Sequence, residues 1–345
     1  MGGPDINARI VIPQQEPEGQ ETLRKLVASD PHYARDPRTR AEAYIKDKLV
    51  EGFGDPVTPG DAGLIGSGDR YFRDFANASI YTDLSGKLDT FVLWGGARER
   101  YRELGGTGSW LGWPTANEAN FVEDGKVNTF EHGAIYWWPD TGPIDLGTVS
   151  VRYRGIYCFS ESDWDQGSPD DEQQVILGMV PAVPGLESTF KSQVYTNVDS
   201  GDSRPDNVEI YRGLPYGLAI STTLLEIDFG GSDVYLDKVK DGVQAAGHTG
   251  AGIAAAFPPG GPVVAIVLEA LLKAFGNDLA TAINQLLGFG DDVIGTQGLF
   301  LSGKDMVTLC RAPRANFWGI EWQRDTPLIV GQGVNTKAYF DVIGV

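Results

Sequence analysis

The sequence predicts a mainly β fold with helical insertions (α+β), in which a small repeat module precedes a β-sandwich. Two observations support this prediction. The chain of 345 residues contains 45 Gly and 20 Pro, which is typical of many tight turns between short strands. In its C-terminal half, several segments alternate apolar and polar residues, as half-buried strands do.

Three parts follow one another along the chain. Residues 1–65 have helix-forming composition and then a turn-rich stretch, so we expect a helical leader and linker there. Residues 66–147 form an aromatic-rich module. The elements expected in the module are a strand, a helix and two further strands, at 79–82, 95–104, 128–131 and 134–138. Residues 148–345 carry the sandwich, with a helical insertion at about 243–289.

The sandwich is predicted from seven segments with strand-like patterns. They are "TVSVRYRGIYCF", "QVILGMVPAV", "VEIYRGLPY", "ISTTLLEIDF", "TQGLFLSG", "DMVTLCRA" and "KAYFDVIGV". The two cysteines, Cys158 and Cys310, fall in the first and the sixth of these segments. A disulfide between neighbouring strands and a pair of buried free thiols are both compatible with this placement.

The charge of the chain excludes some partners. With 28 basic and 47 acidic side chains, the net charge is −19, so phosphate backbones and anionic membrane surfaces repel the protein. We therefore expect no nucleic-acid partner. The N-terminal residues lack the basic start and apolar run of a secretory signal, and no stretch is apolar enough for a spanning helix.

One short phrase occurs twice. Residues 75–86 read "FANASIYTDLSG" and residues 130–142 read "FEHGAIYWWPDTG". Both have the pattern Phe-x-x-small-small-Ile-Tyr followed by turn residues, so the sequence contains one aromatic strand-and-turn unit twice. Repeated units of this size are typical of repeat architectures, in which neighbouring copies bury one another.

The second phrase belongs to a longer pattern with a recognisable order. Its residues are Tyr101, Leu111-Gly112-Trp113-Pro114, Asp124-Gly125, Phe130, Gly133, Ile135-Tyr136, Trp138-Pro139 and Thr141-Gly142. In this order of corner, Asp-Gly turn and aromatic strand, the module resembles the LGFP repeat of bacterial cell-envelope proteins. Residues 75–86 are similar to the tail of an earlier, more degenerate copy. The resemblance implies a non-catalytic protein of the cell envelope or the extracellular space, which binds envelope glycan or a partner protein.

Large amphipathic rings are the candidate ligand-binding residues of the module. They are Trp110, Trp113, Tyr136, Trp137 and Trp138. Flat rings with a polar edge stack on sugars and anchor protein partners, but they also fill cores. In a strand, Tyr136 and Trp138 point to one face and Trp137 to the other. Trp137 and Trp110 are the first choices for contact with a ligand, because Tyr136 and Trp138 hold the repeated positions expected to pack.

Acidic loops in the sandwich are the candidate metal site. The carboxylates considered as Ca²⁺ ligands are Asp163, Asp165, Asp170, Asp171, Asp228 and Asp292. Oxygen-rich loops at one end of a β-module can hold this cation, while ordinary solvated loops have the same composition. The sandwich also resembles, loosely, an uncharacterised class of bacterial β-sandwich domains, through the acidic loop that follows Cys158 and the "EIDFGG" stretch at 226–231.

Two other functions stay open. The apolar segment "GGPVVAIVLEALLKAFG" is too short to span a bilayer and is expected to be a core helix. As a membrane-active hairpin it would instead indicate a secreted effector or toxin-like protein.

A glycoside hydrolase would use Asp163 and Asp165. The chain has no H-E-x-x-H, G-x-S-x-G, C-x-x-C or phosphate-loop motif, which favours a binding protein over an enzyme.

Overall fold

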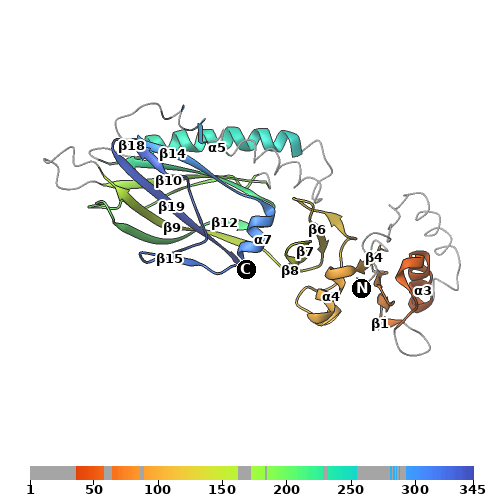
Figure 1. The fold of residues 1–345 in the computed structure, drawn as a ribbon. Helices are drawn as coiled ribbons and strands as arrows, with labels where there is room; N and C mark the ends of the chain where they lie inside the picture. The colour runs from red at the N-terminus through yellow and green to blue at the C-terminus, as the bar shows by residue number, and fades with distance from the viewer. Residues whose placement is uncertain are drawn as a thin grey trace. The chain divides into compact units, whose positions relative to one another are not determined.

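The computed structural model shows a mainly β protein with helical elements, as the sequence predicts (Figure 1). The described residues are 36–57, 64–85, 89–161, 172–182, 185–227, 232–254, 280–281, 283, 285, 287 and 293–345. The chain divides into two compact units. Unit 1 is Met1–Ala119 with Lys126–Asp145, and unit 2 is Asn120–Gly125 with Leu146–Val345.

Unit 1 begins with a helix followed by a four-stranded sheet, which we name copy 1. Asp36 caps helix α3 by accepting a hydrogen bond from the Arg38 amide, and Pro37 occupies the first turn, where its missing N–H costs nothing. The antiparallel sheet has the order β1-β2-β3-β4. The elements of copy 1 are α3 (Pro37–Asp47), the 3₁₀ turn η2 (Glu51–Phe53), β1 (Ile65–Ser67), β2 (Arg70–Asp74), β3 (Ala78–Asp83) and β4 (Asp89–Trp94).

The same succession of elements then repeats as copy 2. A helix is again followed by a 3₁₀ turn and a four-stranded sheet, in the order β5-β6-β7-β8. The elements of copy 2 are α4 (Gly95–Glu103), η3 (Gly106–Gly108), β5 (Ala119–Asn120), β6 (Lys126–Thr129), β7 (Ala134–Trp138) and β8 (Gly142–Leu146). The strand expected at 134–138 has these bounds in the structure, and the helix expected at 95–104 differs from α4 by one residue.

A glycine forms the corner between helix and sheet in each copy. Gly54 has φ +71° and Gly112 has φ +73°, a left-handed conformation that favours glycine. A Cβ on Gly112 would also lie 2.5 Å from Oε2 of Glu131. The corner "LGWP" at 111–114 therefore has its counterpart in "FGDP" at 53–56.

The strand pairing beside this corner is also the same in both copies. Pro56 bridges Phe75 in copy 1, and Pro114 bridges Phe130 in copy 2. The amide of each phenylalanine then closes a tight turn, to the carbonyl of Ala78 at 2.7 Å and to that of Gly133 at 2.8 Å. The described elements between residues 37 and 94 thus follow the order of copy 2, whereas the sequence predicts only the tail of a copy at 75–86 and a leader and linker at 1–65.

Helix α4 joins the two copies. Its Tyr101 ring is fully buried, lies edge-on to Tyr81 of copy 1 and stacks on Phe130 of copy 2, with centroids 5.8 and 4.7 Å apart. The Tyr101 hydroxyl donates to the carbonyl of Gly112 at 2.6 Å and so fixes the corner. The apolar face of α4 is therefore shared between two sheets, which is how tandem repeats bury a continuous core.

Unit 2 consists of two larger antiparallel sheets with two described helices and a small hairpin. One sheet has the order β11-β10-β13-β14, and the other has β12-β9-β19-β17 with β18 beside β19. Their strands are β9 (Val149–Ser160), β10 (Gln173–Pro181), β11 (Ser188–Lys191), β12 (Ser203–Gly213), β13 (Leu218–Glu226), β14 (Val293–Leu301), β17 (Arg324–Asp325), β18 (Ile329–Gly331) and β19 (Val334–Gly344). The helices are α5 (Asp233–Ala254) and α7 (Gly303–Leu309), and the hairpin is β15 (Ala315–Phe317) with β16 (Ile320–Trp322).

Strand β10 belongs to the middle one of three layers, which are helix α5, the sheet of β10 and the sheet of β9. All nine of its residues are buried, because both faces of its sheet are covered (Figure 1). On one face, Val239 and Val243 of α5 pack against it, and a Cβ on Gly178 would lie 2.5 Å from Val243. On the other side the two sheets meet, with the rings of Tyr153 and Phe190 6.2 Å apart. Helix α5 begins at Asp233, before the helical insertion expected at about 243–289.

The prediction of a strand in "DMVTLCRA" is wrong, because residues 303–309 form helix α7. Ser302 and Asp305 make a capping box: the Ser302 hydroxyl accepts from the Asp305 amide at 3.0 Å, and the Asp305 carboxylate accepts from the Ser302 amide. This local signal outweighs the β-branched residues that suggested a strand. Cys158 is buried in β9, Cys310 follows α7, and both thiols are free, with burial raising the pKa of each.

Candidate functional site

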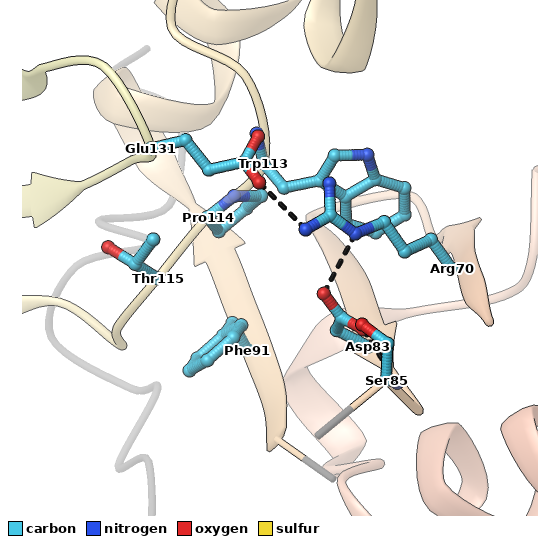
Figure 2. Close-up of a pocket in the computed structure, with 8 residues that line it drawn as sticks. All are labelled: Arg70, Asp83, Ser85, Phe91, Trp113, Pro114, Thr115 and Glu131. Carbon is cyan, nitrogen blue, oxygen red and sulfur yellow. Dashed lines mark hydrogen bonds and ion pairs between the residues drawn. The ribbon is translucent and has the colours of Figure 1, made fainter. Parts of the chain in front are cut away.

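A pocket of about 210 Å³ lies between the two copies of unit 1. Copy 1 contributes residues of β2, β3 and β4 and the turn after β3, and copy 2 contributes the corner and the turn before β7. The lining residues are Arg70, Asp83, Ser85, Phe91, Trp113, Pro114, Thr115 and Glu131 (Figure 2). The pocket therefore exists only because the chain contains both copies.

Arg70 organises the polar side of the pocket. Its Nε donates to Asp83 of copy 1 at 2.8 Å, and its Nη2 donates to Glu131 of copy 2 at 2.7 Å. Its guanidinium lies over the indole of Trp113, 5.6 Å from the ring centroid, a cation–π arrangement (Figure 2). One cation thus holds two carboxylates and an aromatic ring in fixed positions.

The carboxylates of the pocket accept several fixed hydrogen bonds. Oε2 of Glu131 accepts a hydrogen bond from the Trp113 amide at 3.0 Å, and this bond, with the Arg70 contact, lowers the pKa of Glu131. Asp83 also accepts from the amide and hydroxyl of Ser85, at 2.8 and 2.5 Å. Phe91 and Pro114 supply apolar surface beside these groups. Apolar walls with a few fixed polar groups are the usual composition of a small-ligand site.

The structure separates the predicted aromatic residues into exposed and packed ones. Trp110 is 46% exposed, and Trp113 lines the pocket. Tyr136 and Trp138 are fully buried and nearly parallel, with centroids 6.4 Å apart, which places them in the core. Trp137 points to the other face, where its indole lies against Gly96 of α4. Among the five, Trp110 and Trp113 are thus the rings that a ligand can reach with least rearrangement.

The predicted metal ligands lie outside the described residues. This applies to Asp163, Asp165, Asp170, Asp171, Asp228 and Asp292, and to the segment proposed as a membrane hairpin. Within the part of the chain that is described, no group of three or more His, Cys, Asp or Glu side chains is arranged to hold a metal ion. None of the helices described there has both the length and the apolar character needed to cross a membrane.

Sequence reasoning missed Arg70, Asp83 and Glu131 as site residues. Arg70 and Asp83 are paired on neighbouring strands of copy 1, and Glu131 is the second residue of the repeated phrase, where copy 1 has Ala76. The available signal was this difference between the copies. A carboxylate at a position that is alanine in the other copy indicates a local role rather than a requirement of the repeat.

Glu118, a carboxyl of unit 1 that does not line the pocket, makes the free energy of unfolding depend on pH. Burial raises the pKa of Glu118 from its ordinary 4.5 to about 7, with Lys126 opposing the shift. The folded state therefore holds this proton more tightly than the unfolded state does. The contribution of protonated Glu118 to the free energy of unfolding is fully present below about pH 4.5, and it is lost as the pH rises through 7.

We therefore expect Glu118→Gln to be more stable than the wild type at pH 8, by about 1–3 kcal/mol, and close to it at pH 4.5. Urea unfolding of both proteins at the two pH values measures this difference. Glu103→Gln is the control, because the Glu103 side chain is 66% exposed. A difference between Glu118→Gln and wild type that does not change with pH would show that Glu118 is not the titrating group.

The fold and the pocket together define a class: a tandem repeat of helix, glycine corner and four-stranded sheet, with a pocket between copies. In a comparison with known families, residues 111–154 match the LGFP repeat. The match covers the corner and β5–β8 of copy 2 and reaches into β9. LGFP repeats are found in cell-envelope proteins. A comparison with curated proteins gives no match.

Proposed function

We propose that unit 1 attaches this protein to bacterial cell-envelope glycan through the pocket between its two copies, without catalysing a reaction. The observation that carries the proposal is the composition of the pocket. Sugar rings present apolar faces and hydroxyl edges, and the pocket offers Phe91 and Trp113 for the first and the carboxylates of Asp83 and Glu131 for the second.

The charges of the pocket favour a ligand rich in hydroxyl groups. Arg70 is already bonded to two carboxylates, so one positive charge faces two negative ones. An anionic ligand would be repelled by the surplus carboxylate and by the net charge of −19. Hydroxyl groups can instead donate to the carboxylate lone pairs that Arg70 leaves free. Hydrogen bonds to a carboxylate are charge-assisted and strong.

The same electrostatics support binding rather than glycoside hydrolysis. A glycosidase needs one carboxyl that stays protonated near neutral pH as the general acid. Glu131 has the opposite tendency, since the Trp113 amide and Arg70 lower its pKa. Asp83 accepts hydrogen bonds from Arg70 and Ser85, so its oxygens also act as acceptors. Two acceptors fixed by a cation are suited to holding a ligand, and Glu131 is not suited to donating a proton to it.

Filling the pocket tests this function while keeping the Arg70 contacts with Asp83, Glu131 and Trp113, and removes only the Ser85 hydroxyl bond to Asp83. Ser85 is exposed at the pocket rim, so Ser85→Trp is expected to reduce retention on purified insoluble bacterial cell wall at least tenfold in a pull-down with the full chain. Thr141→Trp adds the same bulk at an exposed turn outside the pocket and should be retained like the wild type.

Near-ultraviolet circular dichroism of both variants is the control that tests whether the fold is kept. Equal retention of Ser85→Trp and Thr141→Trp would disprove the role of the pocket. Retention that disappears when the wall is stripped of protein, with its glycan intact, would assign the contact to an envelope protein.

A further inference from the structure

Unit 2 carries an exposed aromatic surface that no part of the proposed function uses. We name it the aromatic face, and it consists of Tyr157 and Phe159 of β9 with Phe317 and Trp318 of the β15–β16 hairpin. Neighbouring rings are in contact: Tyr157 lies 4.8 Å from Phe159 and 4.6 Å from Phe317, and Phe317 lies 6.3 Å from Trp318. Trp318 is 67% exposed and Phe159 45%, so two of the four rings are largely open to solvent.

Trp318 is held in a conformation that its residue type disfavours. It forms the two-residue turn of the hairpin with Gly319, with φ +49° and +85°, a turn that favours Asn-Gly or Gly-Gly. The Trp318 carbonyl accepts a hydrogen bond from the Ser203 hydroxyl at 2.7 Å, which fastens the turn to the sheet. A bulky residue kept in the left-handed region at an exposed tip costs stability, and such strain is typical of functional positions.

The lysine that borders the aromatic face is paired with a carboxylate. Lys337 pairs with Asp325 at 2.6 Å. In the strand register, Ser203 and Lys337 stand on either side of Tyr157, so hydrogen-bonding side chains border the rings on the same face of the sheet. The described cation beside Tyr157, Lys337, is therefore already neutralised by a carboxylate.

We infer that the aromatic face is a second binding surface, which takes a neutral polysaccharide chain. Sugar rings stack on exposed aromatic rings and bond to bordering polar groups, whereas an anionic ligand would have to compete with Asp325 for the Lys337 ammonium. Phe159 and Phe317 are within 23° of parallel, with centroids 6.4 Å apart, so their rings suit successive sugar units of one chain. Immersion in a lipid bilayer would require the ion pair at the border to lose its water, which is costly.

The inference goes beyond the proposed function, because unit 2 alone carries it and the pocket of unit 1 is not involved. The experiment is native affinity electrophoresis of the full chain in gels containing mannan, galactan or hydroxyethyl cellulose. The wild type is expected to be retarded by at least one of them. Trp318→Asn should bind that polysaccharide at least tenfold more weakly, because the ring is lost while the turn receives a residue it favours. Its melting temperature should be equal to that of the wild type or higher.

Several outcomes would overturn the inference. These are no retardation of the wild type by any of the three polysaccharides, binding by Trp318→Asn that equals the wild type, or a lower melting temperature that makes Trp318 a structural residue. Ser85→Trp should be retarded like the wild type, and its loss of retardation would assign the polysaccharide to the pocket of unit 1. Flotation with phosphatidylcholine vesicles that depends on Trp318, without retardation in the gels, would make the aromatic face a lipid-binding surface instead.

Discussion

Asp341→Ala is expected to lower the free energy of unfolding of unit 2 by about 3 kcal/mol. The Asp341 carboxylate is fully buried and accepts from Nε of Arg152 at 2.8 Å and from Nε of Arg314 at 2.7 Å, with a further bond from Arg152. Removing it leaves two guanidinium groups without their buried partner. The loss falls at the lower end of the range for broken buried pairs, since both arginine side chains are partly exposed and can regain water.

Urea unfolding followed by far-ultraviolet circular dichroism measures the loss. The control is Asp325→Ala, because the ion pair between Asp325 and Lys337 is partly exposed on both sides. Such pairs contribute about 0–1 kcal/mol. Equal losses for the two variants would show that burial does not set the importance of these carboxylates.

Arg98→Met is expected to destabilise unit 1 by about 3 kcal/mol. Arg98 of α4 is 3% exposed and donates to the carbonyls of Phe75 and Ala76, at 2.7 and 3.3 Å, and to the Ser79 hydroxyl at 2.8 Å. Methionine keeps an unbranched apolar stem and a similar helix propensity but has no donor. Two of these acceptors, the Phe75 carbonyl and the Ser79 hydroxyl, belong to buried residues and would lose these bonds, and each unsatisfied buried group costs about 1–3 kcal/mol.

Arg102→Met on the same helix is the matched control, because Arg102 is exposed. It should change the free energy of unfolding by less than about 0.5 kcal/mol. Thermal unfolding of both variants, read by tryptophan fluorescence, compares them. A small effect of Arg98→Met would mean that α4 binds to copy 1 through its apolar residues alone.

Local patterns in the sequence predicted those parts of the fold that depend on local physics. The alternation at 134–138 and the helix that ends before Gly105 both follow from neighbouring residues, and both occur in the structure. Copy 1 was not recognised in full because its corner reads "FGDP", with Asp55 where copy 2 has Trp113. The φ angle of its glycine and the strand bridge of its proline are nevertheless the same as in copy 2. The corner requires this glycine and this proline but accepts different residues at the position between them.

The candidate site was less predictable than the fold. Arg70 and Glu131 are far apart in the chain, and no short motif contains both. They meet because α4 places the corner of copy 2 beside the sheet of copy 1, which is a consequence of tertiary packing. Trp113 was named from its sequence context, but its contact with the Arg70 guanidinium was not. Trp318 was not named at all, because a single tryptophan before a glycine carries no periodic signal.

Helix α4 also determines how unit 1 can be divided. The family match begins at Leu111, after α4 has ended, yet the Tyr101 ring of that helix packs against both copies. A fragment cut at the start of the match would lose the helix that covers β7, and a fragment cut before α4 would expose the Tyr81 face of copy 1. The length over which the sequence repeats therefore differs from the shortest length that can fold, and the two copies should melt in a single cooperative transition.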